Sequence, residues 1–273
     1  MSEKFLKLGM SKTPPTKKWG INFGGGINST TMIIECRKRG LKPDWILFAD
    51  TGSEMPWTLE HVDRMTTWCK GWQDITVVRW ERVKGEVIGF EPLHENCLRT
   101  GHLPSKAYGL AGCTSKWKIQ PMDRWRKTNR FQEGSFAVGY DADESGRITS
   151  ACKRGDVPNF TAWYPLVAWG IGREECNNIC KSEGLNIGKS SCFMCPNMRV
   201  HEWKSMYENH PDLYEKACVI EENARNNGNL GRGGSGLGQG NLRELKKNFD
   251  MPDLFDLMRP ALEDRCHHAG CFT

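Results

Sequence analysis

Two stretches near the start of the chain decide the fold: Phe23-Gly-Gly-Gly-Ile-Asn-Ser-Thr30 and Phe48-Ala-Asp-Thr-Gly-Ser-Glu-Met-Pro56. The first follows residues 19–23, in which apolar residues alternate with smaller or polar ones, the pattern of a β-strand. Apolar residues and then a basic stretch follow it, which predicts a helix over about 29–39. A glycine loop that runs into a helix N-terminus suits a phosphate, because unpaired N–H groups and the helix dipole favour an anion. Taken alone, the same three glycines are equally typical of a tight strand–helix connection that binds no ligand.

The alternation of strands and helices continues along the chain. A second helix is predicted at about 57–70, and further strands at 45–49, 75–79 and 136–140. This order is typical of an open parallel sheet flanked by helices, an α/β fold in which ligands bind at the carboxyl ends of the strands. Residues 81–111 show little periodicity. The glycine-rich residues 228–240 predict either a passive mobile loop or one that closes over a phosphate with Arg232.

Composition limits the class of protein. The 273 residues suffice for one sizeable α/β domain with extensions, and we expect a flexible leader at 1–18, the α/β domain at 19–215 and a C-terminal extension at 216–273. No run of eighteen apolar residues exists, so no membrane span is expected. The start of the chain has no apolar signal core, and we therefore predict a cytoplasmic protein. The net charge of +5 is too modest to indicate a dedicated nucleic-acid binder.

The glycine loop resembles the Ser-Gly-Gly-x-Asp-Ser loop of the PP-loop ATP pyrophosphatases, and within that superfamily it is most similar to the phosphoadenosine phosphosulfate (PAPS) reductase-like branch. Four further stretches carry the same resemblance in the same order, over residues 19–196 in all. They are Asp50-Thr-Gly52 with Pro56, Cys113-Thr-Ser-Lys-Trp-Lys-Ile-Gln-Pro121, Tyr164-Pro-Leu166 with Trp169 and Arg173, and Lys189-Ser-Ser-Cys-Phe-Met-Cys-Pro196.

The chain departs from the family pattern at three places. Gly24 stands where the loop's first serine is expected, and Asn28 stands where an aspartate lies near the phosphates and their metal. The reductases proper end in Glu-Cys-Gly-Leu/Ile-His, whereas this chain ends in Arg265-Cys-His-His-Ala-Gly-Cys271. The resemblance therefore implies the fold and nucleotide binding more directly than it implies the reductase reaction.

The resemblance also implies a set of site residues. Ser29, Asp50 and Lys118 are the expected catalytic residues, with Asp50 on a ribose or a metal. The expected nucleotide-binding residues are Phe23, Gly24, Gly25, Gly26, Asn28, Ser29, Thr30, Asp50, Thr51, Gly52, Lys116 and Arg124.

A basic segment with interleaved tryptophans allows two interpretations. It comprises Lys116, Trp117, Lys118, Arg124, Trp125, Arg126, Lys127 and Arg130. Basic and aromatic residues together bind acidic ligands or nucleic acid. The alternative is a solvated helix face whose two tryptophans lie in the core.

The twelve cysteines of a chain expected in a reducing compartment indicate metal ligands or catalysis more than disulfides. Cys192 and Cys195 have metal-ligand spacing, although a redox-active pair has the same spacing. We predict a centre held by Cys113, Cys192, Cys195 and Cys271, either an iron–sulfur cluster or zinc. Cys266, His267 and His268 are alternative tail ligands. Cys36, Cys69, Cys218 and the pair Cys176 and Cys180 are expected in the core.

The leading hypothesis is a PAPS reductase-like PP-loop enzyme that binds ATP or a PAPS-like nucleotide, with magnesium as a further candidate. It would activate a nucleotide or nucleic-acid-related substrate and transfer sulfur to it, which requires a sulfur-donor protein. The first alternative is a PAPS or adenosine phosphosulfate reductase. The second is a non-catalytic nucleotide-binding protein with a metal-stapled tail.

Overall fold

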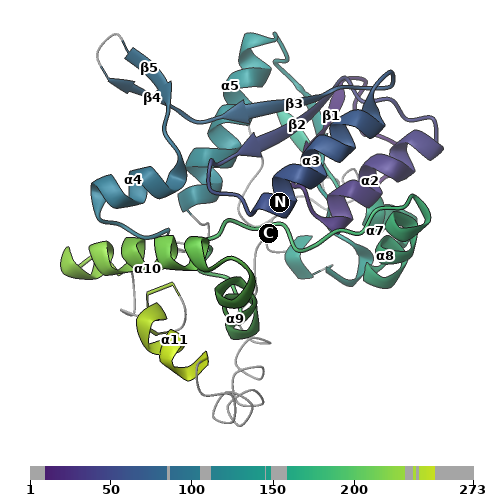
Figure 1. The fold of residues 1–273 in the computed structure, drawn as a ribbon. Helices are drawn as coiled ribbons and strands as arrows, with labels where there is room; N and C mark the ends of the chain where they lie inside the picture. The colour runs from purple at the N-terminus through teal and green to yellow at the C-terminus, as the bar shows by residue number, and fades with distance from the viewer. Residues whose placement is uncertain are drawn as a thin grey trace. The chain divides into compact units, whose positions relative to one another are not determined.

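The computed structural model describes residues 10–84, 87–104, 112–144, 146–148, 159–230, 236–237 and 240–249. They fall into two compact units, drawn in Figure 1. The first unit comprises the residues up to Asp50, Glu54–Val78 and Gln120–Ser190, and the second comprises Thr51–Ser53, Arg79–Ile119 and the residues from Ser191 on. Cys266, His267, His268, Cys271 and Arg232 lie outside the described residues.

The first unit is built on a five-stranded sheet in the order β3-β2-β1-β6-β7. β1 is parallel to both β2 and β6, and β6 is parallel to β7. The strands are β1 (Trp19–Phe23), β2 (Trp45–Asp50), β3 (Ile75–Arg79), β6 (Gly134–Ala137) and β7 (Phe160–Trp163). The helices of this unit are α2 (Ile27–Lys38), α3 (Pro56–Cys69), α5 (Gln120–Thr128), α7 (Pro165–Trp169) and α8 (Arg173–Ser182), with a short 3-10 helix η3 (Ala142–Glu144). The α/β class expected from the sequence is therefore confirmed.

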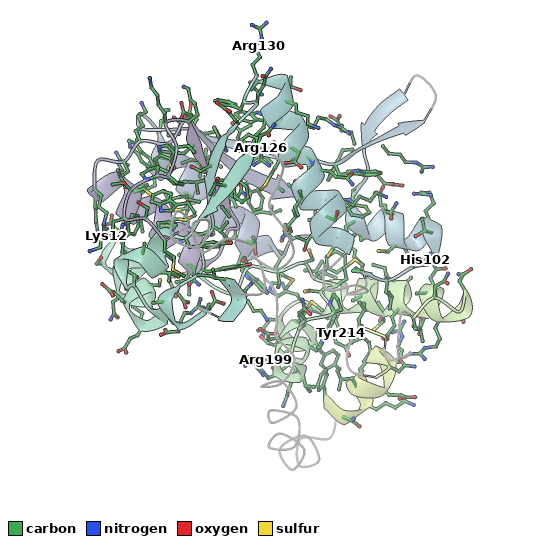
Figure 2. All side chains as sticks on the ribbon, turned by 180° about the vertical axis from the view of Figure 1, so that it is seen from behind. Lys12, His102, Arg126, Arg130, Arg199 and Tyr214 are labelled. Atoms are coloured by element: carbon green, nitrogen blue, oxygen red, sulfur yellow. The ribbon has the colours of Figure 1, made fainter. Side chains whose placement is uncertain are left out.

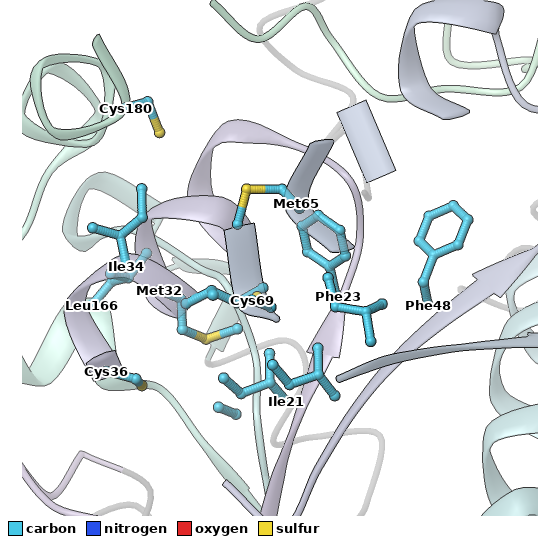
Figure 3. Close-up of a cluster of buried hydrophobic side chains, with 14 of the residues drawn as sticks. Ile21, Phe23, Met32, Ile34, Cys36, Phe48, Met65, Cys69, Leu166 and Cys180 are labelled. Carbon is cyan, nitrogen blue, oxygen red and sulfur yellow. The ribbon is translucent and has the colours of Figure 1, made fainter. Parts of the chain in front are cut away.

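Both faces of the sheet are buried, which explains why β2 is apolar at almost every position. Ile46 and Phe48 point to one face, where they join a core cluster with Ile21, Phe23 and residues of α2, α3, α7 and α8; Figure 3 shows part of this cluster. Trp45, Leu47 and Ala49 point to the other face, where Met122 of α5 packs. Period-two alternation with two apolar faces is what a sheet covered on both sides requires.

The order of the strands reverses at β1. β2 and β3 lie on one side of β1, whereas β6 and β7 lie on the other. In open α/β sheets, ligands bind beyond the carboxyl ends of the strands at such a reversal. The glycine loop follows the carboxyl end of β1, and Gly139 follows that of β6. A Cβ atom at Gly139 would lie 2.9 Å from the backbone nitrogen of Ser29, so the segments after the two strands touch at this point.

The second unit consists of a hairpin and a group of helices. β4 (Glu81–Lys84) pairs antiparallel with β5 (Val87–Phe90). The helices are α4 (Leu93–Thr100), a π-helix η2 (Thr114–Ile119), α9 (Val200–Asn209), α10 (Pro211–Asn226) and α11 (Leu242–Phe249). Aromatic side chains of α9, α10 and α11 pack together: Trp203 and Tyr207 against Tyr214, and Tyr214 against Phe249. Tyr214 is labelled in Figure 2, and its hydroxyl donates to the carbonyl of Leu242 over 2.7 Å.

Several sequence predictions of elements differ from the structure in detail. The fourth expected strand is shorter and begins earlier, at Gly134–Ala137 rather than 136–140, and two residues beyond its end Gly139 lies against the start of α2. Residues 81–111 show little periodicity in the sequence, yet the described part of this range contains the hairpin and α4. The ranges 1–18, 19–215 and 216–273 stay a prediction; residue 215 lies inside α10. Within 1–18, the carbonyls of Ser11 and Lys12 accept from the indoles of Trp163 and Trp169.

Candidate nucleotide-binding site and thiolate pair

The glycine loop between β1 and α2 needs glycine for two different reasons. Gly25 has φ of +73°, and a Cβ there would lie 3.1 Å from Cγ2 of Thr58. At Gly26 a Cβ would lie 2.9 Å from the hydroxyl oxygen of Ser190, so that segment passes directly over the loop. Gly24, by contrast, is exposed, and its Cβ would meet only Ser29 Oγ at 3.7 Å. The loop is therefore closely packed at two glycines and open at the first.

No side chain caps the N-terminus of α2 or places a negative charge in its first turn. Its N-cap residue is Gly26. The first N–H groups of a helix have no partner within the helix, and the helix dipole makes this end electropositive. An anionic group at the loop would meet both features.

Two hydroxyl groups brace the loop. Ser29 Oγ accepts from the N–H of Gly24 over 3.2 Å and donates to the carbonyl of Gly26 over 3.0 Å. Thr30 Oγ1 donates to the same carbonyl over 2.9 Å and lies 2.8 Å from Nε2 of His61. Thr30 is fully buried and Ser29 nearly so. These contacts give both residues a role in shaping the loop, and the phosphate contacts predicted for their hydroxyls stay a prediction.

Asn28 connects the loop to an acidic turn after β6. Its amide nitrogen donates to Asp141 over 2.8 Å and to Glu144 over 3.1 Å, and its amide oxygen accepts from Arg173 over 2.8 Å. Burial raises the pKa of Asp141, an effect that the bond from Asn28 opposes and the charge of Glu144 reinforces. Asn28 carries no charge that could neutralise the two carboxylates, but its amide nitrogen donates a hydrogen bond to each of them.

The predicted residues of the second motif lie at the end of β2. Asp50 is its last residue and is buried, and Thr51 is fully buried. Gly52 has φ of +69°, and a Cβ there would lie 2.6 Å from the ring of Phe90, so this position requires glycine. Phe23, the last residue of β1, packs its ring against Phe48 and His61.

The basic segment does not form one surface. Arg126 is buried in the first unit and pairs with Asp123, whereas Arg124 and Arg130 of the same unit are exposed. Figure 2 shows Arg130 projecting from the ribbon and Arg126 lying within it. Lys116 and Lys118 are partly buried and count with the second unit, as does the buried Trp117. The interpretation that places the tryptophans in the core is therefore correct for Trp117, whereas Arg126, which it expected on a solvated face, is buried.

Cys192 and Cys195 lie at the two ends of one backbone turn in the second unit. The N–H of Cys195 donates to the carbonyl of Cys192 over 3.2 Å, and Thr51 Oγ1 lies 3.4 Å from Cys192 Sγ. Two thiolates so placed fit two ligand positions of an iron–sulfur cluster or of zinc. In the described ranges no group of three or more His, Cys, Asp or Glu side chains could hold a metal ion. Cys113 is thus not grouped with this pair, and the four-cysteine centre stays a prediction.

The cysteines expected in the core are found there. Cys36, Cys69 and Cys218 are fully inaccessible, and burial raises the thiol pKa of Cys69 and of Cys218 to about 12. Cys176 and Cys180 are buried against α2, where Thr31 Oγ1 lies 3.3 Å from Cys180 Sγ. A buried thiol in apolar surroundings resists ionisation and is a poor nucleophile.

Sequence reasoning missed three residues around the loop: His61, Asp141 and Ser190. His61 lies one turn into α3 on its buried face, a pattern that alone indicates an ordinary core residue. Asp141 follows β6 at the carboxyl edge of the sheet, and this position could have identified it, since parallel strands bring such residues together. Ser190 lies in a segment without regular structure, which no local pattern places near Gly26.

No helix in the described part of the chain is long and apolar enough to cross a membrane. No protein-family model matches the chain. An uncharacterized protein of Methanocaldococcus jannaschii is 26% identical over 230 residues, which are 78% of this chain but only 43% of that protein. The chain thus spans less than half the length of this curated relative.

The solved structures that are similar to the chain include a reductase and a thiolase. The PAPS reductase from Candida auris, in a phosphate complex, has a TM-score of 0.38 and 14% identity, over 67% of this chain and 80% of that one. The U34-tRNA thiolase NcsA from Methanococcus maripaludis, with its 4Fe-4S cluster, has a TM-score of 0.41 and 14% identity, over 81% and 78%.

Proposed function

We propose that the first unit binds an adenine nucleotide, ATP or a PAPS-like compound, with its phosphates at Gly24–Gly26. The observation that carries this proposal is the position of the loop, which follows β1 where the strand order reverses and precedes an uncapped helix N-terminus. The exposed backbone of Gly24 leaves room for a phosphate to approach. Backbone N–H groups of the loop would bind its oxygens, and Ser29 and Thr30 would keep the loop in shape.

Other residues would take the remaining roles. Asp50, at the carboxyl end of the strand beside β1, would contact the ribose or a magnesium ion bound to the phosphates. Asp141 and Glu144, held by Asn28, are further carboxylates on the same unit. Arg124, an exposed cation of the same unit, would neutralise charge that develops on a phosphate or sulfate group. The roles expected for Lys116 and Lys118, which count with the second unit, stay a prediction.

We infer that the reaction is an ATP-dependent activation followed by sulfur transfer. An oxygen of the acceptor would attack the α-phosphorus of ATP, so that acceptor–AMP forms and pyrophosphate leaves. Hydrosulfide delivered by a donor protein would then attack the activated carbon of the acceptor, so that a C–S bond forms, the C–O bond breaks and AMP leaves. Cys192 and Cys195 would supply two ligands of an iron–sulfur cluster, which binds sulfur, or of zinc, which would be structural. The alternatives are reduction of PAPS, in which sulfite leaves, and nucleotide binding without catalysis.

Nucleotide binding is tested by thermal unfolding with ATP, ADP, AMP, PAPS and adenosine. A ligand that binds only the folded state raises Tm as its concentration exceeds Kd. Gly24→Ala should fold normally, because its Cβ has only an ordinary contact, and yet lose most of the shift by ATP since the methyl group crowds the loop. Gly112→Ala is the matched control, since its Cβ has open space in the second unit. Absence of a shift with every nucleotide at millimolar concentration would refute the proposal.

The reaction is tested separately. Pyrophosphate release from ATP, stimulated by candidate acceptors, supports activation. Sulfite release from PAPS with a thiol reductant supports the reductase alternative. A protein that shows a nucleotide-dependent Tm shift and neither product would support the binding protein instead.

A further inference from the structure

Three cations surround one buried carboxylate in the second unit. Glu91 Oε1 accepts from Arg99 Nε over 2.7 Å and from Arg82 Nη1 over 3.2 Å, and its Oε2 accepts from Asn96 over 2.8 Å. Burial raises the pKa of Glu91, but the bonds from Arg99 and Asn96 outweigh this and hold the pKa below its usual value. Burial lowers the pKa of Lys116. The charge of Glu91 raises this pKa, whereas the charges of Arg99 and Arg82 lower it further. Lys116 thus belongs to the same group.

The charges around Glu91 do not balance. One carboxylate compensates one of the three cations, so two positive charges remain close together. Over the described residues 79–84, 87–104 and 112–119, six lysines and arginines face three glutamates and no aspartate. Stability alone gains little from such an excess, because like charges at short range repel. A bound polyanion would relieve the repulsion.

Aromatic rings alternate with these cations. The Lys116 ammonium lies 4.1 Å from the ring centroid of Trp80 and 4.4 Å from that of Trp117. The Arg79 guanidinium lies 5.1 Å from the centroid of Phe90, a side chain that is 38% exposed. Trp80 is partly exposed, and the buried Trp117 donates from its indole to the carbonyl of Glu91 over 3.0 Å. Carboxylate and rings therefore hold the cations in a fixed arrangement.

We propose that this surface, the Glu91 face (Arg79, Trp80, Arg82, Phe90, Arg99 and Lys116), binds single-stranded nucleic acid. The cations would contact backbone phosphates, and unpaired bases would stack on the exposed ring of Phe90 and the partly exposed ring of Trp80. A duplex offers no free base faces to these rings. The inference deepens the proposed function, because it names single-stranded nucleic acid as the class of acceptor. It rests on that function only where it takes the bound strand as the acceptor of the reaction.

The test is fluorescence anisotropy with a labelled single-stranded RNA of about twelve nucleotides, the DNA of the same sequence, and a duplex. The wild type should bind the single strands more tightly than the duplex. Comparing its affinities for the RNA and the DNA shows which of the two the surface prefers. Phe90→Ala should lower the affinity about tenfold without changing its salt dependence, because stacking is not ionic. The double variant Arg82→Gln and Arg99→Gln should reduce the slope of log K against log salt by about 1.4.

Two controls keep the result interpretable. Lys127→Gln removes an exposed cation from α5 in the first unit and should leave binding unchanged. Because Arg82 and Arg99 also support Glu91, Arg79→Gln provides a charge variant that leaves the bonds of Glu91 intact. It should reduce the slope by about 0.7.

Equal loss in Lys127→Gln, equal binding of the duplex, or a Phe90→Ala variant with unchanged affinity would overturn the proposal, as would a wild type that binds no strand. The ATP-induced Tm shift should survive in the Phe90, Arg79 and Arg82/Arg99 variants. If the wild type lacks that shift but binds the single strand, the proposed function fails and the Glu91 face stands.

Discussion

Nε2 of His61 lies 2.8 Å from Oγ1 of Thr30, at the start of the helix that follows the glycine loop. Thr30 donates its single hydroxyl proton to the carbonyl of Gly26, so the histidine must donate to Thr30 from a protonated Nε2. Nδ1 then carries no proton, and within the described structure this buried atom has no hydrogen-bond partner. Burial, together with the charge of Arg64, lowers the pKa of His61 to about 4. The loop is therefore braced by a neutral histidine.

The first prediction follows from this neutral state. The unfolded chain binds a proton at His61 below about pH 6.5, whereas the folded chain does so only below about pH 4. Stability should therefore fall as the pH decreases through this window. The contribution of His61 is a loss of about 2 kcal/mol between about pH 7.5 and about pH 5. His61→Gln should remove this part of the pH dependence, as measured by urea unfolding at both pH values.

His201→Gln, at an exposed position of α9, is the comparison variant. A His61→Gln variant with the same pH dependence as the wild type would show that the folded protein protonates His61 normally. His61→Gln should also weaken the ATP-induced Tm shift at pH 7.5 if the brace shapes the loop.

The second prediction concerns Asn28. In Asn28→Asp the donors to Asp141 and Glu144 are lost, and a third carboxylate stands beside them. The variant should be destabilised by about 1–3 kcal/mol at pH 7, because the carboxylates lose hydrogen bonds and repel each other. Millimolar magnesium should restore part of the lost Tm, since carboxylate oxygens are its preferred ligands.

Asn226→Asp, on the exposed side of α10, serves as the comparison. Its Tm should stay close to that of the wild type and should not change with magnesium. If Asn28→Asp unfolds at the wild-type temperature without magnesium, the hydrogen bonds from Asn28 to the acidic turn do not contribute to stability.

The third prediction concerns the thiolate pair. Protein purified without oxygen should contain iron and sulfide, or zinc, and Cys195→Ser should lose it because thiolate ligation couples folding to the metal. Cys218→Ala, which truncates a core thiol of α10, should lose stability and keep the metal. Elemental analysis decides the question: metal-free wild-type protein that still binds nucleotide would leave Cys192 and Cys195 as a redox-active pair.

The sequence predicted the sheet well because β1 and β2 carry local signals. Alternation over Trp19–Phe23 and a fully apolar Trp45–Ala49 follow directly from burial on two faces. The glycine loop was identifiable since it joins a strand to a helix within one short stretch. The antiparallel strands Glu81–Lys84 and Val87–Phe90 were not identified, because charged and apolar residues are mixed in this short stretch and give no clear period.

The surroundings of the site were less predictable for a physical reason. His61, Asp141 and Ser190 reach the loop from segments 31 to 164 residues away from Thr30 or Gly26, through contacts that only the folded chain creates. The basic segment 116–130 is one stretch of sequence, but it runs from the second unit into the first, where Arg126 is buried. Charge spacing alone does not show which side chains of a helix turn inward.

The last prediction concerns Glu221, a buried carboxylate of α10. Its oxygens accept from the N–H of Leu237 over 2.8 Å and of Leu242 over 2.7 Å, and thus fix the chain ahead of α11. Burial raises the pKa of Glu221, so the folded state binds the proton more tightly than the unfolded chain. Its contribution to stability is therefore fully present below about pH 4.5 and decreases as the pH rises.

Glu221→Gln retains one acceptor and loses the other, which should cost about 1–3 kcal/mol at pH 4. The difference from wild type should be smaller at pH 7, where only the wild type carries a buried charge. Urea unfolding at both pH values measures this, with the exposed Glu60→Gln as the comparison. A larger difference at pH 7 than at pH 4 would mean that the two amides bind the ionised carboxylate more strongly than burial opposes it.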